Sequence, residues 1–162
     1  RRFLASYRAT SVMRGSWVGP GTYCIWLASH VQSRSNSVPR EVRALVASAV
    51  ARADGRPIGA HLHDTRGLGV ANGLAALEAG ASRLDAALGG LGGCPFAPGA
   101  SGNVAIEDLA HVLEESGVDT GLDVDALVNA AHLACELVGR PVGSHVGLAG
   151  RRFRELAPAP GS

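Results

Sequence analysis

Two histidines, His61 and His63, are separated by a single residue in a segment that has the pattern of a β-strand. Successive side chains of a strand point to opposite faces, so residues two apart share a face and both imidazoles can reach one metal ion. Asp64 and Thr65 follow directly, which places the pair at the C-terminal end of the strand. A single strand histidine is more often a hydrogen-bonded core residue than a ligand, but the pair in this setting predicts a metal site.

A glycine-rich segment, residues 89–93, leads to Cys94, and Asn103 offers an amide oxygen further along the chain. A thiol that follows consecutive glycines lies in a segment too flexible to bury it permanently. Cys24 and Cys135 are instead expected to be inert packing residues. A generic flexible linker is the alternative interpretation of this segment. The thiol and the metal ion could share one site.

Four stretches together resemble the 3-hydroxy-3-methylglutaryl-CoA lyase family. They are His-Leu-His-Asp-Thr at 61–65, Ala-Asn-Gly-Leu-Ala-Ala-Leu-Glu-Ala-Gly at 71–80, Gly-Leu-Gly-Gly-Cys-Pro-Phe at 90–96 and Gly-Ala-Ser-Gly-Asn at 99–103. The resemblance is close over 58–117, weaker from 38 and on to 150, and not apparent before residue 38. That family is a metal-dependent barrel of βα units, and this chain is similar to its C-terminal half.

Hydrophobic periodicity predicts alternating helices and strands. The expected helices are 38–53, 70–79, 106–116 and 123–138, the expected strands are 57–63 and 82–88, and a further short strand could form at 23–27. This order favours parallel strands joined by crossover helices. Together with the resemblance, it predicts an α/β fold: part of a (β/α)8 TIM barrel, comprising its last two or so parallel strands, followed by C-terminal helices.

Three regions are expected. Residues 1–37 form an atypical segment that does not match the family, residues 38–150 form the C-terminal half of the lyase-type barrel, and residues 151–162 form a disordered tail. For the first region, one hypothesis is a segment out of frame or from a rearranged start. The alternative is a divergent but genuine segment.

Composition excludes several classes of protein. A net charge of +1 over 162 residues gives no reason to expect nucleic acid or an anionic membrane as a partner. No apolar run reaches the roughly 18 residues that a membrane helix needs. Three cysteines without a short repeated spacing argue against a disulfide framework and favour a cytoplasmic location.

The resemblance implies roles for individual residues. His61, His63 and Asn103 would bind a divalent cation, Mg²⁺ or Mn²⁺, with His63 also counted among the catalytic residues. Cys94 would be the catalytic thiol on a mobile loop, acting as an acid and base rather than as a nucleophile. Glu107 would be a catalytic acid, although a favourable charge at a helix start is its simpler role.

The carboxylates near these ligands are a separate question. Asp64 would either orient an imidazole from outside the coordination shell or cap the turn that follows it. Mg²⁺ and Mn²⁺ normally need a carboxylate ligand, which the family supplies from a first barrel strand that this chain lacks. Asp54 and Asp85 are not expected to replace it because of their positions. The remaining ligands are neutral, so metal binding is expected to be weak.

The implied reaction is the metal-assisted cleavage of 3-hydroxy-3-methylglutaryl-CoA to acetyl-CoA and acetoacetate, a step of leucine degradation and ketone body formation. The partner is therefore an acyl-CoA substrate, and activity is expected to be impaired in this chain. A related acyl-CoA lyase or condensing synthase of the same barrel superfamily is one alternative. Another is an inactive fragment or interaction remnant, because an uncovered barrel edge invites homo-oligomers or pairing with another chain.

Overall fold

The structure is a computed structural model that describes residues 23–26, 37–92 and 102–151. The described residues form three strands, five α-helices and one short 3₁₀ turn. In chain order these are β1 (Tyr23–Trp26), α1 (Pro39–Arg52), β2 (Ile58–His61), α2 (Gly69–Glu78), β3 (Arg83–Asp85), η1 (Leu88–Gly90), α3 (Ile106–Glu115), α4 (Val124–Leu137) and α5 (His145–Ala149).

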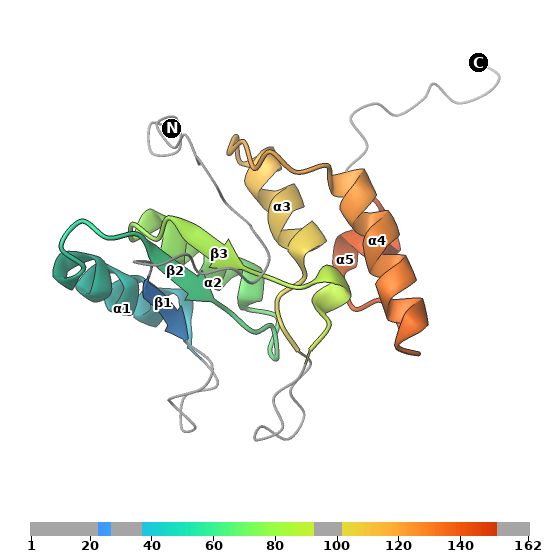
Figure 1. The fold of residues 1–162 in the computed structure, drawn as a ribbon, viewed down its shortest axis with the longest axis horizontal. Helices are drawn as coiled ribbons and strands as arrows, with labels where there is room; N and C mark the ends of the chain where they lie inside the picture. Colours follow the sequence, from blue (N-terminus) through green and yellow to red (C-terminus); the bar gives the residue numbers. More distant parts are fainter. Residues whose placement is uncertain (1–22, 27–36, 93–101, 152–162) are drawn as a thin grey trace, which may run out of the picture.

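The strands form one parallel sheet with the order β1-β2-β3, so β2 lies in the middle (Figure 1). Parallel strands with intervening helices were predicted, and this is confirmed. The further short strand that could form at 23–27 is present as β1, and Tyr23–Trp26 pairs along the whole of Ile58–His61, so the sheet has three described strands. The third strand comes from the segment in which the sequence shows no resemblance.

Helix α1 packs against α2 and β2. Pro39 lies in its first turn, where a missing N–H costs no hydrogen bond, and the Glu41 carboxylate accepts from the backbone N–H of Val38 at 3.4 Å. Its buried face is narrower than the sequence pattern predicts. Val42 and Val46 are fully buried, whereas Leu45 is 46% exposed.

Helices α3, α4 and α5 form a second group beside the sheet (Figure 1). Leu109 and Leu113 of α3 are fully buried in the core with Leu84 of β3. The predicted N-cap of α4 is confirmed, since the Asp123 carboxylate accepts from Ala126 N–H at 3.0 Å. Val138 was placed on the buried stripe of α4, but it follows the last turn and is 56% exposed.

The short helix α5 was not predicted, because five residues are too few to show a helical period. Ser144, which is buried, caps it by accepting from Gly147 N–H at 3.0 Å. The following Arg151 pairs with Glu114 at 3.1 Å and with Asp125 at 3.5 Å. The predicted disorder of the tail concerns residues 152–162, which lie outside the described residues. Among the helices that are described, none has the length and apolarity to cross a membrane.

Candidate functional site

His61 is the last residue of β2, and His63 follows just beyond the strand end. Their ring centroids lie 5.3 Å apart, with the ring planes at 69° to each other. The spacing in the sequence therefore brings the two imidazoles together, as predicted.

Asn103 is held beside this pair by the backbone. His63 and Asn103 form an isolated antiparallel bridge, with Asp64 N–H donating to Gly102 C=O and Val104 N–H donating to Leu62 C=O, both at 3.1 Å. The segment that returns from the glycine-rich loop thus runs alongside the end of β2. The three predicted metal ligands converge, although Asn103 is far from the histidines in the sequence.

The imidazoles are in a setting that keeps them uncharged. Burial lowers the pKa of His61, and the negative charge of Asp85 and a side-chain hydrogen bond with Asn103 oppose this only in part. Burial and then the neighbouring His61 lower the pKa of His63. A neutral imidazole keeps the lone pair that a metal ion requires.

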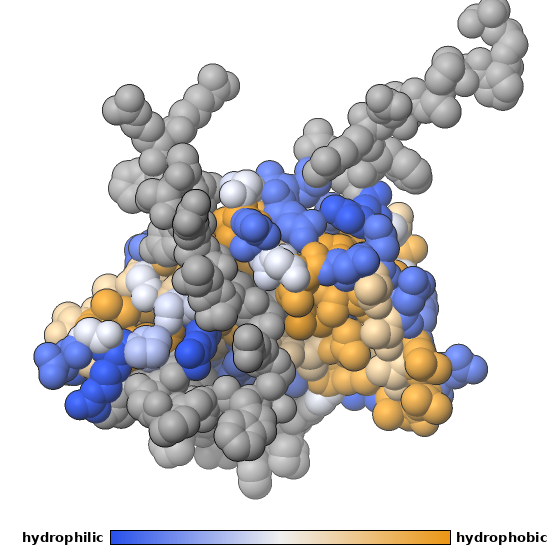
Figure 2. Space-filling view, turned by 45° about the horizontal axis from the view of Figure 1, so that its top comes forward, coloured by the Kyte–Doolittle hydropathy of each residue, from blue (hydrophilic) through white to orange (hydrophobic). Residues whose placement is uncertain are grey.

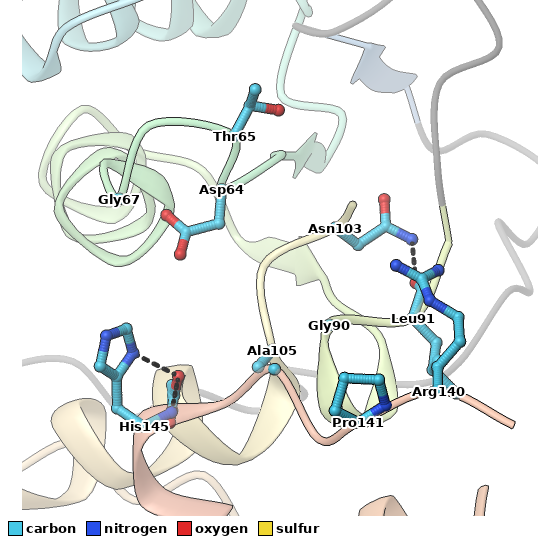
Figure 3. Close-up of a pocket in the computed structure, with 13 residues that line it drawn as sticks. Asp64, Thr65, Gly67, Gly90, Leu91, Asn103, Ala105, Arg140, Pro141 and His145 are labelled. Atoms are coloured by element: carbon cyan, nitrogen blue, oxygen red, sulfur yellow. Dashed lines mark hydrogen bonds and ion pairs between the residues drawn. The ribbon is translucent and has the colours of Figure 1, made fainter. Parts of the chain in front are cut away.

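The Asn103 side chain is oriented by a backbone contact. Its Nδ2 donates to the Leu91 carbonyl oxygen at 3.0 Å, and the amide oxygen lies on the other side of the amide group (Figure 3). Gly92 makes this approach feasible, because a Cβ at that position would lie 2.6 Å from the Asn103 Nδ2. The amide is therefore fixed by the same glycine-rich segment that leads to Cys94.

These donors fit part of a metal coordination sphere. Two neutral imidazoles and one amide oxygen face one another, and such ligands bind divalent cations. In the part of the chain that the structure describes, no group of three or more His, Cys, Asp or Glu side chains could hold a metal ion. Metal binding by these three side chains stays a prediction.

Asp85 lies closer to this site than its position in the sequence suggested. It is the register partner of His61 on the neighbouring strand, and its Oδ2 lies 4.0 Å from His61 Nδ1. Among the described residues it does not complete a three-group cluster of His, Cys, Asp or Glu. Its proximity to His61 was missed. Both residues are the last of neighbouring parallel strands, and the carboxyl ends of such strands lie side by side. This shared position could have revealed that Asp85 lies close to His61.

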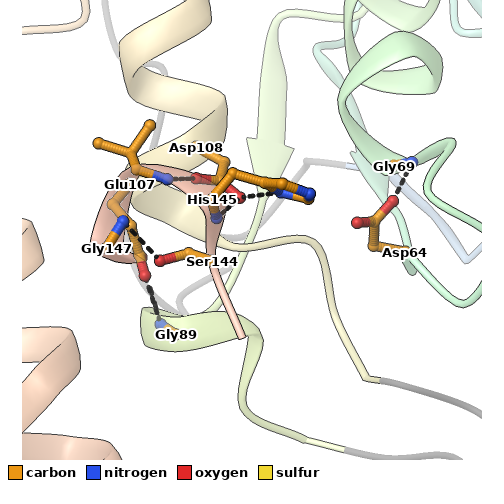
Figure 4. Close-up of polar contacts among 9 residues, drawn as sticks. Asp64, Gly69, Gly89, Glu107, Asp108, Ser144, His145 and Gly147 are labelled. Carbon is orange, nitrogen blue, oxygen red and sulfur yellow. Dashed lines mark hydrogen bonds and ion pairs between the residues drawn. The ribbon is translucent and has the colours of Figure 1, made fainter. Parts of the chain in front are cut away.

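Asp64 caps a helix. Its Oδ1 accepts from Gly69 N–H, the first residue of α2, at 2.5 Å (Figure 4). The capping alternative is therefore what the structure shows, with the helix start rather than the turn at 65–67 as its target. Gly69 has no room for a side chain, because an added Cβ would lie 2.8 Å from the same carboxylate oxygen.

Glu107 is fully buried in the first turn of α3. Its carboxylate accepts from Gly89 N–H, with oxygen distances of 2.9 and 3.2 Å (Figure 4). This contact links α3 to the turn from which the glycine-rich segment departs. It gives Glu107 a structural role, and its catalytic role stays a prediction.

A pocket of about 300 Å³ adjoins the strand ends, lined in part by Asn103, Arg140, Asp108 and His145 (Figure 3). Of the three predicted metal ligands, Asn103 lines this pocket. Arg140 donates to the Gly92 carbonyl oxygen at 3.2 Å and so joins the end of α4 to the glycine-rich segment. The predicted thiol, Cys94, lies in residues 93–101, outside the described residues.

Asp108 is an acid that the sequence reasoning did not single out. Its carboxylate accepts from the backbone N–H groups of His145 at 2.9 Å and Val146 at 2.7 Å, and its Oδ2 lies 3.2 Å from His145 Nδ1 (Figure 4). It thereby anchors the start of α5 at the rim of the pocket. The His145 side chain is 86% exposed.

A family model described as HMGL-like matches residues 7–134. The chain belongs to the HMGL-like family. The matched range begins well before Val38, so the resemblance extends into a segment where the sequence alone showed none. Strand β1 of this HMGL-like chain lies within the match.

Individual relatives agree with this assignment. The chain is 46% identical over 120 residues to an (R)-citramalyl-CoA lyase of Chloroflexus aurantiacus, covering 74% of this chain and 38% of that protein. It is 40% identical over 136 residues to the mitochondrial hydroxymethylglutaryl-CoA lyase of Gallus gallus, covering 82% of this chain and 44% of that protein. This HMGL-like chain therefore spans less than half the length of these relatives.

A solved structure of an HMG-CoA lyase from Acinetobacter baumannii, in complex with coenzyme A and 3-methylmalate, is similar with a TM-score of 0.68 and 46% identity. The similarity covers 76% of this chain and 40% of that one. The HMGL-like fold assignment thus rests on sequence and on structure. The coarser part of the fold prediction, an α/β chain with a small parallel sheet in this family, is confirmed.

Proposed function

We propose that the chain contributes the metal-binding end of an acyl-CoA lyase that cleaves 3-hydroxy-3-methylglutaryl-CoA to acetyl-CoA and acetoacetate. The observation that supports this most directly is the convergence of His61, His63 and Asn103 at the carboxyl end of the parallel strands. Barrel enzymes carry their chemistry at this end of the strands. The family match and the lyase relatives supply the reaction class.

A divalent cation, when bound, would act as a Lewis acid toward the tertiary alcohol and a neighbouring oxygen of the substrate. His61 and His63 would hold it with uncharged ring nitrogens, because the pKa of each is lowered by burial. Asn103 would add its amide oxygen. Cys94 would exchange a proton with the acetyl-CoA product, an assignment that depends on the family resemblance.

A second substrate is supported by a specific observation. A relative named (R)-citramalyl-CoA lyase is 46% identical to the chain over 120 residues. Both substrates named by the relatives are acyl-CoA esters, and the described pocket, with Arg140 and His145 at its rim, is compatible with a polar acyl group. Citramalyl-CoA is therefore the alternative substrate.

An assay of both acyl-CoA esters tests the proposal. The purified chain is incubated with each ester in the presence of Mg²⁺ or Mn²⁺. The release of acetyl-CoA is measured for both esters, together with acetoacetate from 3-hydroxy-3-methylglutaryl-CoA and pyruvate from citramalyl-CoA. We expect slow cleavage of 3-hydroxy-3-methylglutaryl-CoA that a chelator or His63→Ala abolishes. Circular dichroism shows whether the protein is folded. A folded protein that cleaves neither ester would show that the chain is an inactive relative.

The remaining expectations belong to the same proposal. The chain would act in the cytoplasm on leucine-derived acyl-CoA, without nucleic acid or membrane partners. Strands β1 and β3 are the two edges of the described sheet, and pairing through one of them, with a second copy or another chain, would cover backbone groups that the sheet leaves open.

A further inference from the structure

Asp85 and His61 occupy equivalent positions on adjacent strands. Both are the last residues of their strands, and they are register partners in the parallel pairing of β2 with β3. The preceding pair, Ala60 and Leu84, is buried in the core. Because side chains alternate along a strand, His61 and Asp85 both point to the opposite face.

The contact between them has a defined direction. His61 Nδ1 is the ring nitrogen that faces Asp85, at 4.0 Å from Oδ2. The His61 side chain is 13% exposed, whereas that of Asp85 is 37% exposed. A charged carboxylate only accepts hydrogen bonds, so it favours the imidazole tautomer that carries its proton on the facing nitrogen.

We propose that Asp85 is a positioning residue that keeps the His61 proton on Nδ1 and thereby presents Nε2, with its lone pair, to the cation site shared with His63 and Asn103. The inference deepens the proposed function and rests on it for the identity of the site. Histidines that bind metals commonly donate their second N–H to a carboxylate, which fixes the ring orientation. At 4.0 Å the Asp85 carboxylate lies beyond hydrogen-bonding distance and acts on the imidazole through its negative charge.

A direct ligand role for Asp85 is less consistent with the geometry. The described residues contain no three-membered cluster of His, Cys, Asp or Glu around which a metal ion could bind. The Asp85 carboxylate approaches the outer nitrogen of His61 instead.

The tautomer of His61 tests the inference on the full chain without metal. Long-range ¹H–¹⁵N correlation spectra identify the protonated ring nitrogen, and His61→Gln assigns the signal. We expect Nδ1–H to dominate in the wild-type protein, and Asp85→Ala to shift the population toward Nε2–H, the tautomer that an unperturbed histidine side chain prefers in water. Asp125→Ala, which removes an exposed carboxylate from α4, is the matched control and should leave the tautomer unchanged.

Asp85→Asn provides a second variant that keeps the shape of the side chain should Asp85→Ala fail to fold. It should lower the Nδ1–H population, because a neutral amide is a weaker acceptor and can also donate. The same tautomer in the wild-type protein and in the folded Asp85 variants would overturn the inference. A merely structural role of Asp85 would change stability but not the tautomer.

Titration with Mn²⁺ separates this inference from the proposed function. We expect Asp85→Ala to weaken Mn²⁺ binding by about 10- to 100-fold, and Asp85→Glu to restore part of the affinity. Wild-type protein that does not bind Mn²⁺ at all would count against the proposed function, whereas the tautomer result would still decide the role of Asp85. Unchanged Mn²⁺ affinity in Asp85→Ala would overturn the positioning role.

Discussion

His63 and Asn103 are paired across an antiparallel bridge although the whole of α2, β3 and the glycine-rich segment separates them in the chain. The bridge is reinforced on either side by the hydrogen bonds from Asp64 to Gly102 and from Val104 to Leu62, each 3.1 Å long. Backbone pairing, rather than side-chain packing, therefore sets the position of the amide ligand. The site depends on the conformation of the segment that returns at Gly102.

Replacing His63 by alanine is expected to abolish Mn²⁺ binding, because the remaining imidazole and amide are too few ligands. Binding by the wild-type protein should be weaker than submicromolar, since its described ligands are neutral. Calorimetric titration measures both. His132→Ala is the control, because this exposed histidine contacts the Gly147 carbonyl oxygen away from the site. Submicromolar affinity of the wild type would contradict the prediction.

Stability should fall as the pH drops below the ordinary histidine pKa of 6.5. The folded-state pKa values of His61 and His63 are lowered, so the unfolded chain binds protons more readily there. The contribution of the two neutral histidines to the free energy of unfolding is complete above pH 6.5. It is lost as the pH falls toward their pKa values in the folded state. Denaturant unfolding at several pH values measures the effect, and His61→Gln/His63→Gln should show a shallower dependence. Parallel profiles for the two proteins would refute it.

Gly102→Ala should destabilise the chain and disturb the site. Gly102 has a φ of 118°, and an added Cβ would collide with the Gly90 carbonyl oxygen. We expect overpacking to lower the free energy of unfolding by about 1–3 kcal/mol, in addition to the cost of placing alanine at a positive φ. Gly117→Ala is the matched control, because its φ of 83° is also positive but no atom lies within 4 Å of the added Cβ. Equal losses of unfolding free energy would exclude the collision as the cause.

Glu107 variants distinguish its structural role from its predicted catalytic role. Glu107→Ala leaves the Gly89 N–H without its acceptor, which should cost about 1–3 kcal/mol of unfolding free energy. Glu107→Gln keeps an acceptor oxygen and should cost less. Thermal unfolding and acyl-CoA cleavage are measured on both. A Gln variant that stays stable but loses cleavage would establish a catalytic role, whereas parallel changes in both properties would indicate a structural one.

The apolar surface of α4 should promote self-association. Leu133 and Leu137 of this helix and Val138 directly after it are more than half exposed, and Figure 2 shows apolar residues gathered on that side of the molecule. Leu133→Gln/Leu137→Gln should lower the apparent mass in light scattering, with the exposed Glu136→Gln as control. A monomeric wild-type protein would remove the basis for this prediction.

Local patterns were sufficient for most of the elements. The period of Val42 and Val46 identified α1, and Asp123 correctly marked the start of α4. The errors lie where tertiary contacts act. Val138 continues the apolar pattern in sequence but is 56% exposed. Helix α5 is too short to show a period, and Asp108 and Ser144 fix its start.

The sequence by itself determined the paired histidines, the alternation of parallel strands and helices, and the relation to the HMGL-like lyase family, because these follow from spacing, periodicity and short motifs. Tertiary structure alone decided which distant groups join the pair. It placed Asn103 beside His63 and Asp85 close to His61, and it assigned the Asp64 carboxylate to the start of α2. The physical reason is that strand register and loop return bring together residues whose separation along the chain carries no periodic signal.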